Sequence, residues 1–360
     1  MKAIADHRGV FRFMKKKYNV GVVGYGWAAT AHIEAINATT QGQVTAVCST
    51  RNLDASDLAA QHGGAISAYN DLSSMLADPA IDVVDITGLP SKHAEQAVAA
   101  ANAKKHIILE KPMANSPEEV AAILQAAKAN GIHGCVCFEL RYSEQLQVTK
   151  ELLEKGLLGQ LHYGEIDYYH GIGPWYGQFR WNTGKKDGGS ALLTAGCHAM
   201  DALLMMMGDR QVESVTSMST KTNSPTFDPY EYDTSSVTLV KFADGALGKT
   251  AAIVDCFQPY YFHTHLVGSE GSLLDDRFTS MKLSKERNAW HRLSMKMCDS
   301  GDVSDHPYQS QFQEFFNALD RDEEMPLTSF SDAARTFEVI FAADQSASSG
   351  GQPVVPESFS

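Results

Sequence analysis

Residues 18–26 read YNVGVVGYG, and this short stretch predicts how the first half of the chain folds. Its β-branched residues indicate a buried strand, and Gly24 and Gly26 follow that strand directly, with Ala29 three positions further on. This is the G-x-G-x-x-G/A pattern at the mouth of a helix. In that pattern Gly24 permits the turn, Gly26 lets the backbone approach a pyrophosphate, and Ala29 allows close helix packing. The stretch therefore predicts a dinucleotide-binding loop, and a purely structural glycine turn is the alternative.

Strands and helices alternate from this stretch to about residue 140. Such alternation predicts a doubly wound parallel sheet with right-handed crossovers, because parallel strands need a helical connection between them. We therefore expect an α/β Rossmann domain over residues 18–140. The segments that carry the pattern are AATAHIEAIN, QVTAVCS, IDVVDIT, SKHAEQAVAAANA, KHIILE, SPEEVAAILQAAKANG and IHGCVCF.

The pattern changes beyond this domain. Helices are expected near 145–156 and after Gly196, and long alternating segments follow them, joined by turns such as ADG and GSEG. We expect an α+β domain over residues 141–330, with an open, mainly antiparallel sheet and helices on one face. A helix at 331–347 is expected to pack back against the first domain, and residues 1–17 are expected to form an N-terminal tail.

Composition restricts the partners of the chain. Its 360 residues exceed the size at which one core usually stops growing, which favours two domains. The formal net charge of −13 argues against a nucleic-acid or anionic membrane surface, since either needs a basic face. No apolar run is long enough for a secretory signal or a membrane span. We therefore expect a cytoplasmic protein that acts on small molecules.

The sequence predicts no metal site. The six cysteines are scattered through the chain, make no disulfide framework and are interpreted as reduced thiols. Cys135 and Cys137 would point to one face of an apolar strand, with no second ligand pair after them. His263 and His265 share a predicted strand face, but no carboxylate or cysteine partner stands near them in the sequence.

An acidic residue is expected at the end of the second strand of an NAD-binding domain, where it holds the adenine ribose. Here that place reads Ser49, Thr50 and Arg51, whose hydroxyls and guanidinium suit the 2′-phosphate of NADP. The cofactor expected is therefore NAD(P), with a slight lean to NADP. Arg51 lying over the adenine, or facing solvent, is the alternative. The residues expected at the cofactor are Gly24, Tyr25, Gly26, Trp27, Ala28, Ala29, Ser49, Thr50, Arg51, Thr87, Leu89, Pro90, His93, Glu110 and Lys111.

Two further segments contain residues that can take part in catalysis. LEKPMA puts Lys111 at the carboxyl end of a predicted strand, where open α/β sheets bind their ligands. GGSALLTAGCHAMD puts Thr194 and His198 on one helix face, although a lone histidine of this kind also occurs in cores. Together with VGVVGYG and GLPSKH, these segments make the sequence resemble the Gfo/Idh/MocA family of oxidoreductases from about residue 18 to 345.

The resemblance implies that Lys111 and His198 line one active site, together with an aspartate four residues before the histidine. Thr194 occupies that position here, and it can bond a substrate hydroxyl but cannot act as a carboxylate base. His198 is then the expected base, Lys111 the group that stabilises the alkoxide, and Thr194 the group that orients the sugar. The expected substrate contacts are Arg141, His170, Trp175, Arg180 and Trp181.

The leading hypothesis is an NAD(P)-dependent oxidoreductase that transfers a hydride between nicotinamide and a secondary hydroxyl or keto group of a sugar, glycoside or polyol. A glycosidase that oxidises and re-reduces its sugar with tightly held NAD is the first alternative. A sugar or dinucleotide sensor without chemistry is the second, and the presence of both Lys111 and His198 argues against it. We also expect a homodimer or homotetramer that forms through the sheet of the second domain.

Overall fold

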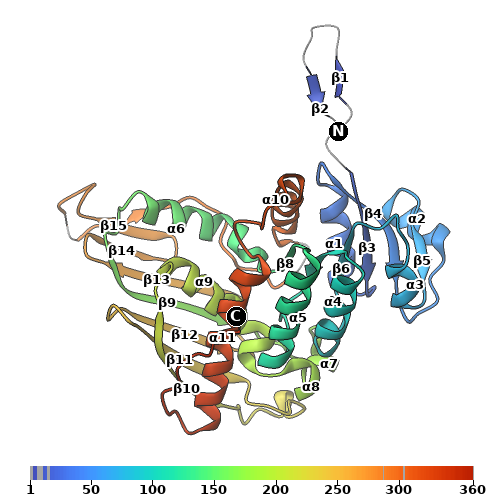
Figure 1. The fold of residues 1–360 in the computed structure, drawn as a ribbon. Coiled ribbons are helices and arrows are strands. Elements are labelled where there is room, and N and C mark those ends of the chain that lie inside the picture. The colour runs from blue at the N-terminus through green and yellow to red at the C-terminus, as the bar shows by residue number, and fades with distance from the viewer. Residues whose placement is uncertain (1–2, 6–10, 14–16, 287, 303–304, 360) are drawn as a thin grey trace.

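The computed structural model describes residues 3–5, 11–13, 17–286, 288–302 and 305–359. Figure 1 shows a parallel sheet near the start of the chain beside a larger second sheet, with helices between them. Within the expected tail, β1 (Ala3–Ala5) pairs antiparallel with β2 (Phe11–Phe13). The rest of that tail up to residue 16 lies outside the described residues.

The first sheet has parallel strands in the order β5-β4-β3-β6-β7-β8. Counted from β3, this is the 3-2-1-4-5-6 order of a Rossmann sheet, so the predicted doubly wound fold is confirmed. Its strands are β3 (Tyr18–Val23), β4 (Gly42–Cys48), β5 (Ser67–Tyr69), β6 (Val83–Ile86), β7 (His106–Leu109) and β8 (Gly134–Val136). Its helices are α1 (Trp27–Asn37), α2 (Ala55–His62), α3 (Leu72–Leu76), α4 (His93–Asn102) and α5 (Pro117–Asn130).

The Rossmann sheet is buried on both faces, which explains the apolar runs of its strands. Val20 and Val22 of β3 belong to the core under α1, whereas Val84 and Ile86 of β6 belong to the core under α4 and α5. Helix α10 (Tyr308–Arg321) completes the core under α1 with three phenylalanines. The expected division of the chain at residue 330 is therefore wrong for this helix, because its apolar face is covered by the first domain.

The second sheet has eight strands in the order β10-β11-β12-β9-β13-β14-β15-β16. All neighbours are antiparallel except β12 and β9, so the expectation of a mainly antiparallel sheet is confirmed. The sequence analysis missed its central strand, β9 (Leu161–Tyr169). The other strands are β10 (Val212–Thr220), β11 (Ser235–Phe242), β12 (Leu247–Ile253), β13 (Tyr261–Gly268), β14 (Gly271–Leu274), β15 (Arg277–Ser280) and β16 (His291–Arg292).

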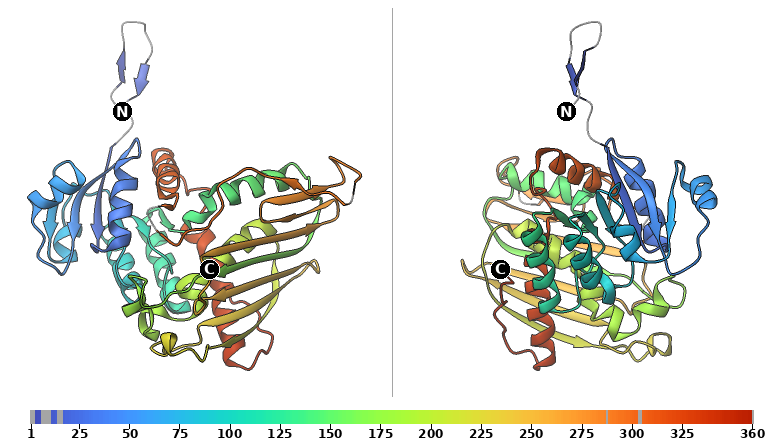
Figure 2. Two further views of the ribbon diagram at one scale, coloured as in Figure 1. Left: turned by 180° about the vertical axis from the view of Figure 1, so that it is seen from behind. Right: turned by 45° about the vertical axis from the view of Figure 1, so that its right-hand side comes forward.

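Helices cover one face of the second sheet, as Figure 2 shows. Helix α9 (Cys197–Met207) lies on β9 and β12 and also contacts α6 (Glu144–Glu154). Helix α11 (Phe330–Ser348) lies on β10 and also contacts α5 and β8, so it joins the two domains. Short helices α7 (Phe179–Asn182) and α8 (Lys185–Gly188) belong to the connection between β9 and α9. Among the described residues, no helix has the length and apolarity needed to cross a bilayer.

Candidate active site

A cleft of about 1090 Å³ lies at the carboxyl ends of β3, β4 and β6, beside the N-terminus of α1. Gly24 has a φ of +99°, a left-handed conformation that favours glycine, and a Cβ added there would lie 3.0 Å from Thr87 Oγ1. Gly26 begins α1, where no side chain caps the first turn and an added Cβ would meet open space. The amide groups of that turn are therefore available to an anion in the cleft.

Most residues expected at the cofactor line this cleft. The Arg51 guanidinium lies 5.6 Å from the centroid of the Tyr25 ring and donates to the Tyr25 carbonyl oxygen. Ala29 belongs to α1 and is fully buried, which suits its expected role in packing. Gly24, Tyr25, Gly26, Trp27, Ala28, Ser49, Thr50, Arg51, Thr87 and Leu89 line the cleft, whereas Pro90, Glu110 and Lys111 line an adjoining pocket.

His93 does not reach the cleft, so the expected cofactor contact there is wrong. The ring is fully buried, with Nδ1 2.7 Å from the Pro112 carbonyl oxygen and Nε2 3.3 Å from the Gly88 carbonyl oxygen. Because both ring nitrogens face backbone carbonyls, the histidine ties the loop after β6 to the loop after β7. His93 therefore holds together two loops that border the site, without lining the site itself.

The adjoining pocket brings together the residues that were expected to carry chemistry. Lys111, Thr194 and His198 all line it, although they come from different domains. It adjoins the cleft at the glycine loop, since both are bordered by Ala28, Thr87, Gly88, Tyr176, Gln178 and Trp181. A small molecule in the pocket would therefore lie next to a ligand in the cleft.

Lys111 follows β7 and reaches across to the second domain. Its Nζ donates to the Thr194 carbonyl oxygen at 3.1 Å, and its backbone N–H donates to Glu110 Oε2 at 2.9 Å. The peptide bond to Pro112 is cis. These contacts hold the ammonium group beside the segment that carries His198, so a charged donor faces the pocket.

His198 lies in the first turn of α9, directly after a π-helical turn over Leu192–Gly196. Its ring is only 4% exposed, lies against Phe138 and Tyr168, and leaves Nδ1 without a hydrogen-bond partner among the described residues. Burial lowers the pKa of His198 to about 4, and the nearby Glu139 carboxylate opposes this effect. The imidazole is therefore neutral at pH 7 and able to accept a proton.

Thr194 faces the pocket with a hydroxyl that already has one partner. This hydroxyl donates to Asn182 Oδ1, which also accepts a hydrogen bond of 3.1 Å from the Tyr232 hydroxyl. The proton of Thr194 is thus engaged, whereas its oxygen keeps lone pairs for a ligand. Towards a ligand, Thr194 can act as a hydrogen-bond acceptor.

Aromatic side chains close the site on the side of the second domain. The rings of Trp27 and Tyr176 meet edge to face at 5.5 Å, which joins the glycine loop to the segment after β9. Trp181 borders both the pocket and the cleft, whereas Trp175 and Arg180 border the cleft and not the pocket. Of the five expected substrate contacts, Trp181 is therefore the one that lines the pocket.

The structure gives Arg141 an internal partner in place of the expected substrate contact, whereas the expected contact at His170 stays a prediction. Arg141 is buried and donates from Nε and Nη2 to both carboxylate oxygens of Asp201, at 2.7 and 2.6 Å. A further nitrogen of Arg141 donates to Asp332, so the guanidinium is committed to an internal ion pair. His170 packs against the Tyr176 ring, with centroids 4.7 Å apart, and lies outside the residues that line the pocket.

The sequence analysis missed several polar residues of the pocket, among them Glu139, His306 and Tyr308. Glu139 follows β8, and the rule that open α/β sheets bind ligands at the carboxyl ends of their strands could have found it. His306 precedes α10 and Tyr308 is its first residue, and no motif placed that helix on the first domain. Glu139 Oε1 lies 2.8 Å from His306 Nδ1 and 3.9 Å from His198 Nε2.

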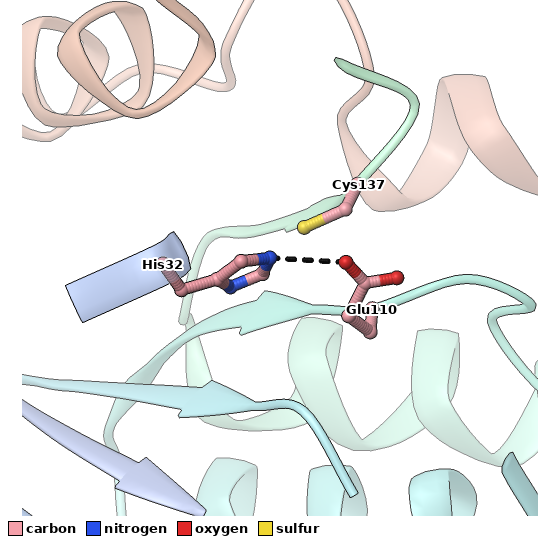
Figure 3. Close-up of side chains that lie close together, drawn as sticks. All are labelled: His32, Glu110 and Cys137. Carbon is pink, nitrogen blue, oxygen red and sulfur yellow. Dashed lines mark hydrogen bonds and ion pairs between the residues drawn. The ribbon is translucent and has the colours of Figure 1, made fainter. Parts of the chain in front are cut away.

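A buried chain of polar groups supports Glu110, the neighbour of Lys111. Figure 3 shows His32 of α1 facing Glu110, with 3.0 Å between Nε2 and Oε1 and with Cys137 close by. His32 Nδ1 lies 3.0 Å from Asp85 Oδ1. Burial alone would lower the pKa of His32, but the two carboxylates raise it to about 10. Because a doubly protonated imidazole has no lone pair for a metal, this cluster is an ion-pair chain that positions Glu110.

A second cluster with potential metal ligands lies on the outer face of the second sheet. There the structure supplies the carboxylate partner that the sequence did not show, since Glu165 of β9 lies beside His263 and His265. Glu165 accepts a hydrogen bond of 2.8 Å from Lys249 Nζ, and His263 Nδ1 lies 3.1 Å from Asp275. These groups are paired with one another, and Lys249 Nζ also contacts Asp167 at 2.6 Å.

Two family models match the chain. Residues 18–137 match an oxidoreductase family with an NAD-binding Rossmann fold, and residues 146–274 match the GFO/IDH/MocA C-terminal domain. The chain belongs to the Gfo/Idh/MocA family. The glycine loop and Lys111 fall in the first matched region, and His198 falls in the second.

Curated relatives of this Gfo/Idh/MocA chain include dehydrogenases. It is 28% identical to levoglucosan dehydrogenase of Pseudarthrobacter phenanthrenivorans, over 71% of this chain and 73% of that protein. It is 25% identical to myo-inositol 2-dehydrogenase of Thermotoga maritima, over 74% of this chain and 78% of that protein. An uncharacterized oxidoreductase of Synechocystis is 32% identical over 53% of this chain, which spans 52% of that relative's length.

Solved structures share the whole architecture of this Gfo/Idh/MocA chain. Levoglucosan dehydrogenase in complex with NADH has a TM-score of 0.81 and 24% sequence identity, covering 95% of this chain and 100% of that one. The same enzyme in complex with NADH and levoglucosan has a TM-score of 0.79. At this level of identity the likeness establishes the common fold of both domains.

Proposed function

We propose that this protein is an NAD(P)-dependent dehydrogenase that transfers a hydride between nicotinamide and a secondary hydroxyl or keto carbon of a sugar, glycoside or polyol. The observation that carries the proposal is that Lys111 and His198 line one pocket beside the dinucleotide cleft. Alcohol oxidation needs a proton acceptor and a group that stabilises the developing alkoxide, and these two residues supply both. Relatives named as levoglucosan and inositol dehydrogenases support a polyhydroxylated substrate.

Each of the three residues has a separate proposed role in the reaction. His198 takes the proton of the substrate hydroxyl, Lys111 holds the same oxygen while its negative charge grows, and Thr194 accepts a hydrogen bond from a neighbouring hydroxyl. Bound NAD(P)⁺ would accept the hydride in the cleft. In the direction of reduction, His198 returns the proton to the carbonyl oxygen. The aromatic wall around Tyr176 and Trp181 keeps bulk water away from the reacting groups.

Replacing Gly26 by valine is expected to abolish dinucleotide binding without unfolding the protein. Gly26 has a φ of −110° and a ψ of −165°, an extended conformation that valine adopts readily, and its Cβ would meet no atom within 4 Å. The side chain would instead fill the space that a pyrophosphate needs at the N-terminus of α1. Calorimetric titration with NADH and NADPH measures binding, and thermal melting controls for folding. Unchanged affinity would show that the dinucleotide binds elsewhere.

NADP is expected to bind at least as well as NAD. The end of the cleft near Ser49 and Thr50 offers hydroxyls, and Arg51 offers a positive charge for a 2′-phosphate. The Asp71 carboxylate also lines this end of the cleft, but it already accepts hydrogen bonds from Ser73 and Ser74 at the start of α3. Parallel titrations with both cofactors decide the question. A preference for NAD greater than about tenfold, equal to about 1.4 kcal/mol, would contradict the expectation.

A panel of monosaccharides, glycosides and polyols tests the proposed function. Each compound is assayed with NAD and with NADP by the absorbance of the reduced nicotinamide, and at least one secondary alcohol is expected to be oxidised. Cleavage of a glycoside without net formation of reduced cofactor would favour a glycosidase instead. Intact dinucleotide binding without turnover of any compound would favour a sensor.

We further propose a homodimer or homotetramer that forms through the outer face of the second sheet and acts in the cytoplasm. The helices cover the other face, and this one leaves large apolar side chains exposed, namely Met218, Val237, Leu239, Leu247 and Tyr261. Large apolar side chains are costly to leave in water. The cysteines are free thiols, which suits a reducing compartment. Light scattering should give two or four times 39.2 kDa, and a monomer at micromolar concentration would contradict the assembly.

A further inference from the structure

The candidate pocket contains a buried acid that the proposed chemistry does not yet use. Glu139 begins a short 3₁₀ turn after β8 and is 1% exposed. Its carboxylate oxygens accept no well-aligned hydrogen bond among the described residues, so its partner there is an ion-pair contact with His306 at 2.8 Å. A buried charge is costly unless neighbouring groups compensate it, so such a group at a pocket wall points to a role in the site.

Two histidines from different parts of the chain face this acid. Glu139 Oε1 lies 2.8 Å from His306 Nδ1, in the segment before α10, and 3.9 Å from His198 Nε2, in α9. Burial alone would raise the pKa of Glu139, but its interactions with His198 and His306 hold it below its ordinary value. The carboxylate is therefore ionised in the folded protein and lies within electrostatic reach of the expected base.

We propose that Glu139 is a positioning residue of this site: its carboxylate, held by His306, orients the His198 ring and stabilises the charge that His198 gains with the substrate proton. This role rests on the proposed dehydrogenase function of the same pocket. Aromatic rings exclude water from His198, and the Lys111 ammonium in the same pocket opposes a second positive charge. A carboxylate offsets both effects, whereas Thr194 in the preceding turn is uncharged.

The step that Glu139 assists is balanced without any bond to Glu139 itself. The hydroxyl O–H bond breaks as an N–H bond forms at His198, and the C–H bond gives its electron pair to bound nicotinamide as a hydride. The alcohol is thereby oxidised and the nicotinamide reduced. Glu139 keeps its charge throughout, so it acts by orientation and electrostatic attraction alone.

The other groups that face His198 do not fill this role. Its charged and titratable neighbours are Glu139, Lys111, His306 and Glu110. Lys111 and His306 oppose a positive charge on His198. Glu110 is already paired with His32 and accepts a hydrogen bond of 2.9 Å from the Tyr308 hydroxyl. Glu139 is therefore the carboxylate whose charge is directed at His198.

Two substitutions with opposite expected effects test the role. Glu139→Gln keeps the shape of the side chain and removes its charge, so kcat should fall by about tenfold or more while KM changes little. The acid limb of the pH profile for oxidation should then move down by about one pH unit or more, because His198 becomes a weaker base. His306→Asn removes a positive neighbour of His198, so its acid limb should move to higher pH. A merely structural loss would not move the limb in opposite directions.

NMR titration of the histidines tests the contact between Glu139 and His306 in the absence of substrate and cofactor. Burial alone would lower the pKa of His306, but the contact with Glu139 raises it above its ordinary value. Glu139→Gln should therefore return the pKa of His306 to its ordinary range or below. Asp255→Asn is the matched control, since it also removes a buried carboxylate, one that accepts hydrogen bonds from Thr234 and Ser235 outside the pocket. It should leave the His306 titration and the acid limb unchanged.

The outcomes separate this role from the proposed function. Unchanged kcat and pH profile in Glu139→Gln would overturn the role, and so would a large rise in KM at constant kcat, which would place Glu139 on the substrate. An unaltered His306 titration in that variant would show that the two side chains do not interact. Absence of NAD(P)-linked turnover in the unaltered protein would instead overturn the proposed function, and this role with it.

Discussion

Replacing His198 by alanine is expected to lower turnover by about 10² to 10⁴ while NAD(P) affinity stays nearly unchanged, because the variant loses a positioned base. Affinity should persist because His198 lines the substrate pocket and not the dinucleotide cleft. Steady-state kinetics with an active compound from the panel, together with a cofactor titration, measure both effects. Turnover within about twofold of the unaltered protein would show that His198 is only a core residue.

The pH dependence gives an independent check on His198. Burial lowers its pKa to about 4, so the ring is neutral at pH 7 and already able to accept a proton. Oxidation should therefore lose rate only as the pH falls towards that value, where the ring becomes protonated and stops acting as a base. The acid limb should disappear in His198→Ala. An acid limb that persists in that variant would assign the base to another group.

The Rossmann sheet could be predicted from the sequence because its signals are local. Apolar runs mark each strand, the Gly24–Gly26 loop marks the first turn, and the right-handed crossover rule orders the rest. Strand β9 was missed because its partners, β12 and β13, follow it only after a long intervening segment. Helix α10 was assigned to the wrong domain for a related reason, since its phenylalanine face meets a core built from the first strands of the chain.

In the candidate site, too, residues in local motifs could be predicted, whereas contacts between distant segments could not. Lys111 and His198 stand in motifs of adjacent residues, so the sequence could indicate them. The Glu139–His306 contact depends on how the end of β8 meets the segment before α10, and no spacing in the sequence encodes it. Arg141 was expected at the substrate, and no feature of the sequence indicated its internal partner. Its actual partner, Asp201, lies on another helix.

Replacing Arg141 by methionine is expected to lower the free energy of unfolding by about 3 to 5 kcal/mol. Methionine keeps the apolar stem, but Asp201 would lose two charge-assisted hydrogen bonds and keep only the Thr336 hydroxyl, at 2.9 Å, as a donor. A buried carboxylate without its counter-ion is strongly destabilising. Urea denaturation measures the change. Arg335→Met is a control, because it removes an exposed arginine paired with Asp209 and should change stability little.

The pH dependence of this variant separates an ion pair from a substrate contact. Burial raises the pKa of Asp201, and Arg141 opposes that rise. Without Arg141, the folded state binds the Asp201 proton more tightly than the unfolded state, so its stability falls as the pH rises. The deficit against the unaltered protein should therefore shrink as the pH is lowered from 7 towards 5. Undiminished stability together with a raised KM would instead return Arg141 to the substrate-binding role that its place in the sequence suggested.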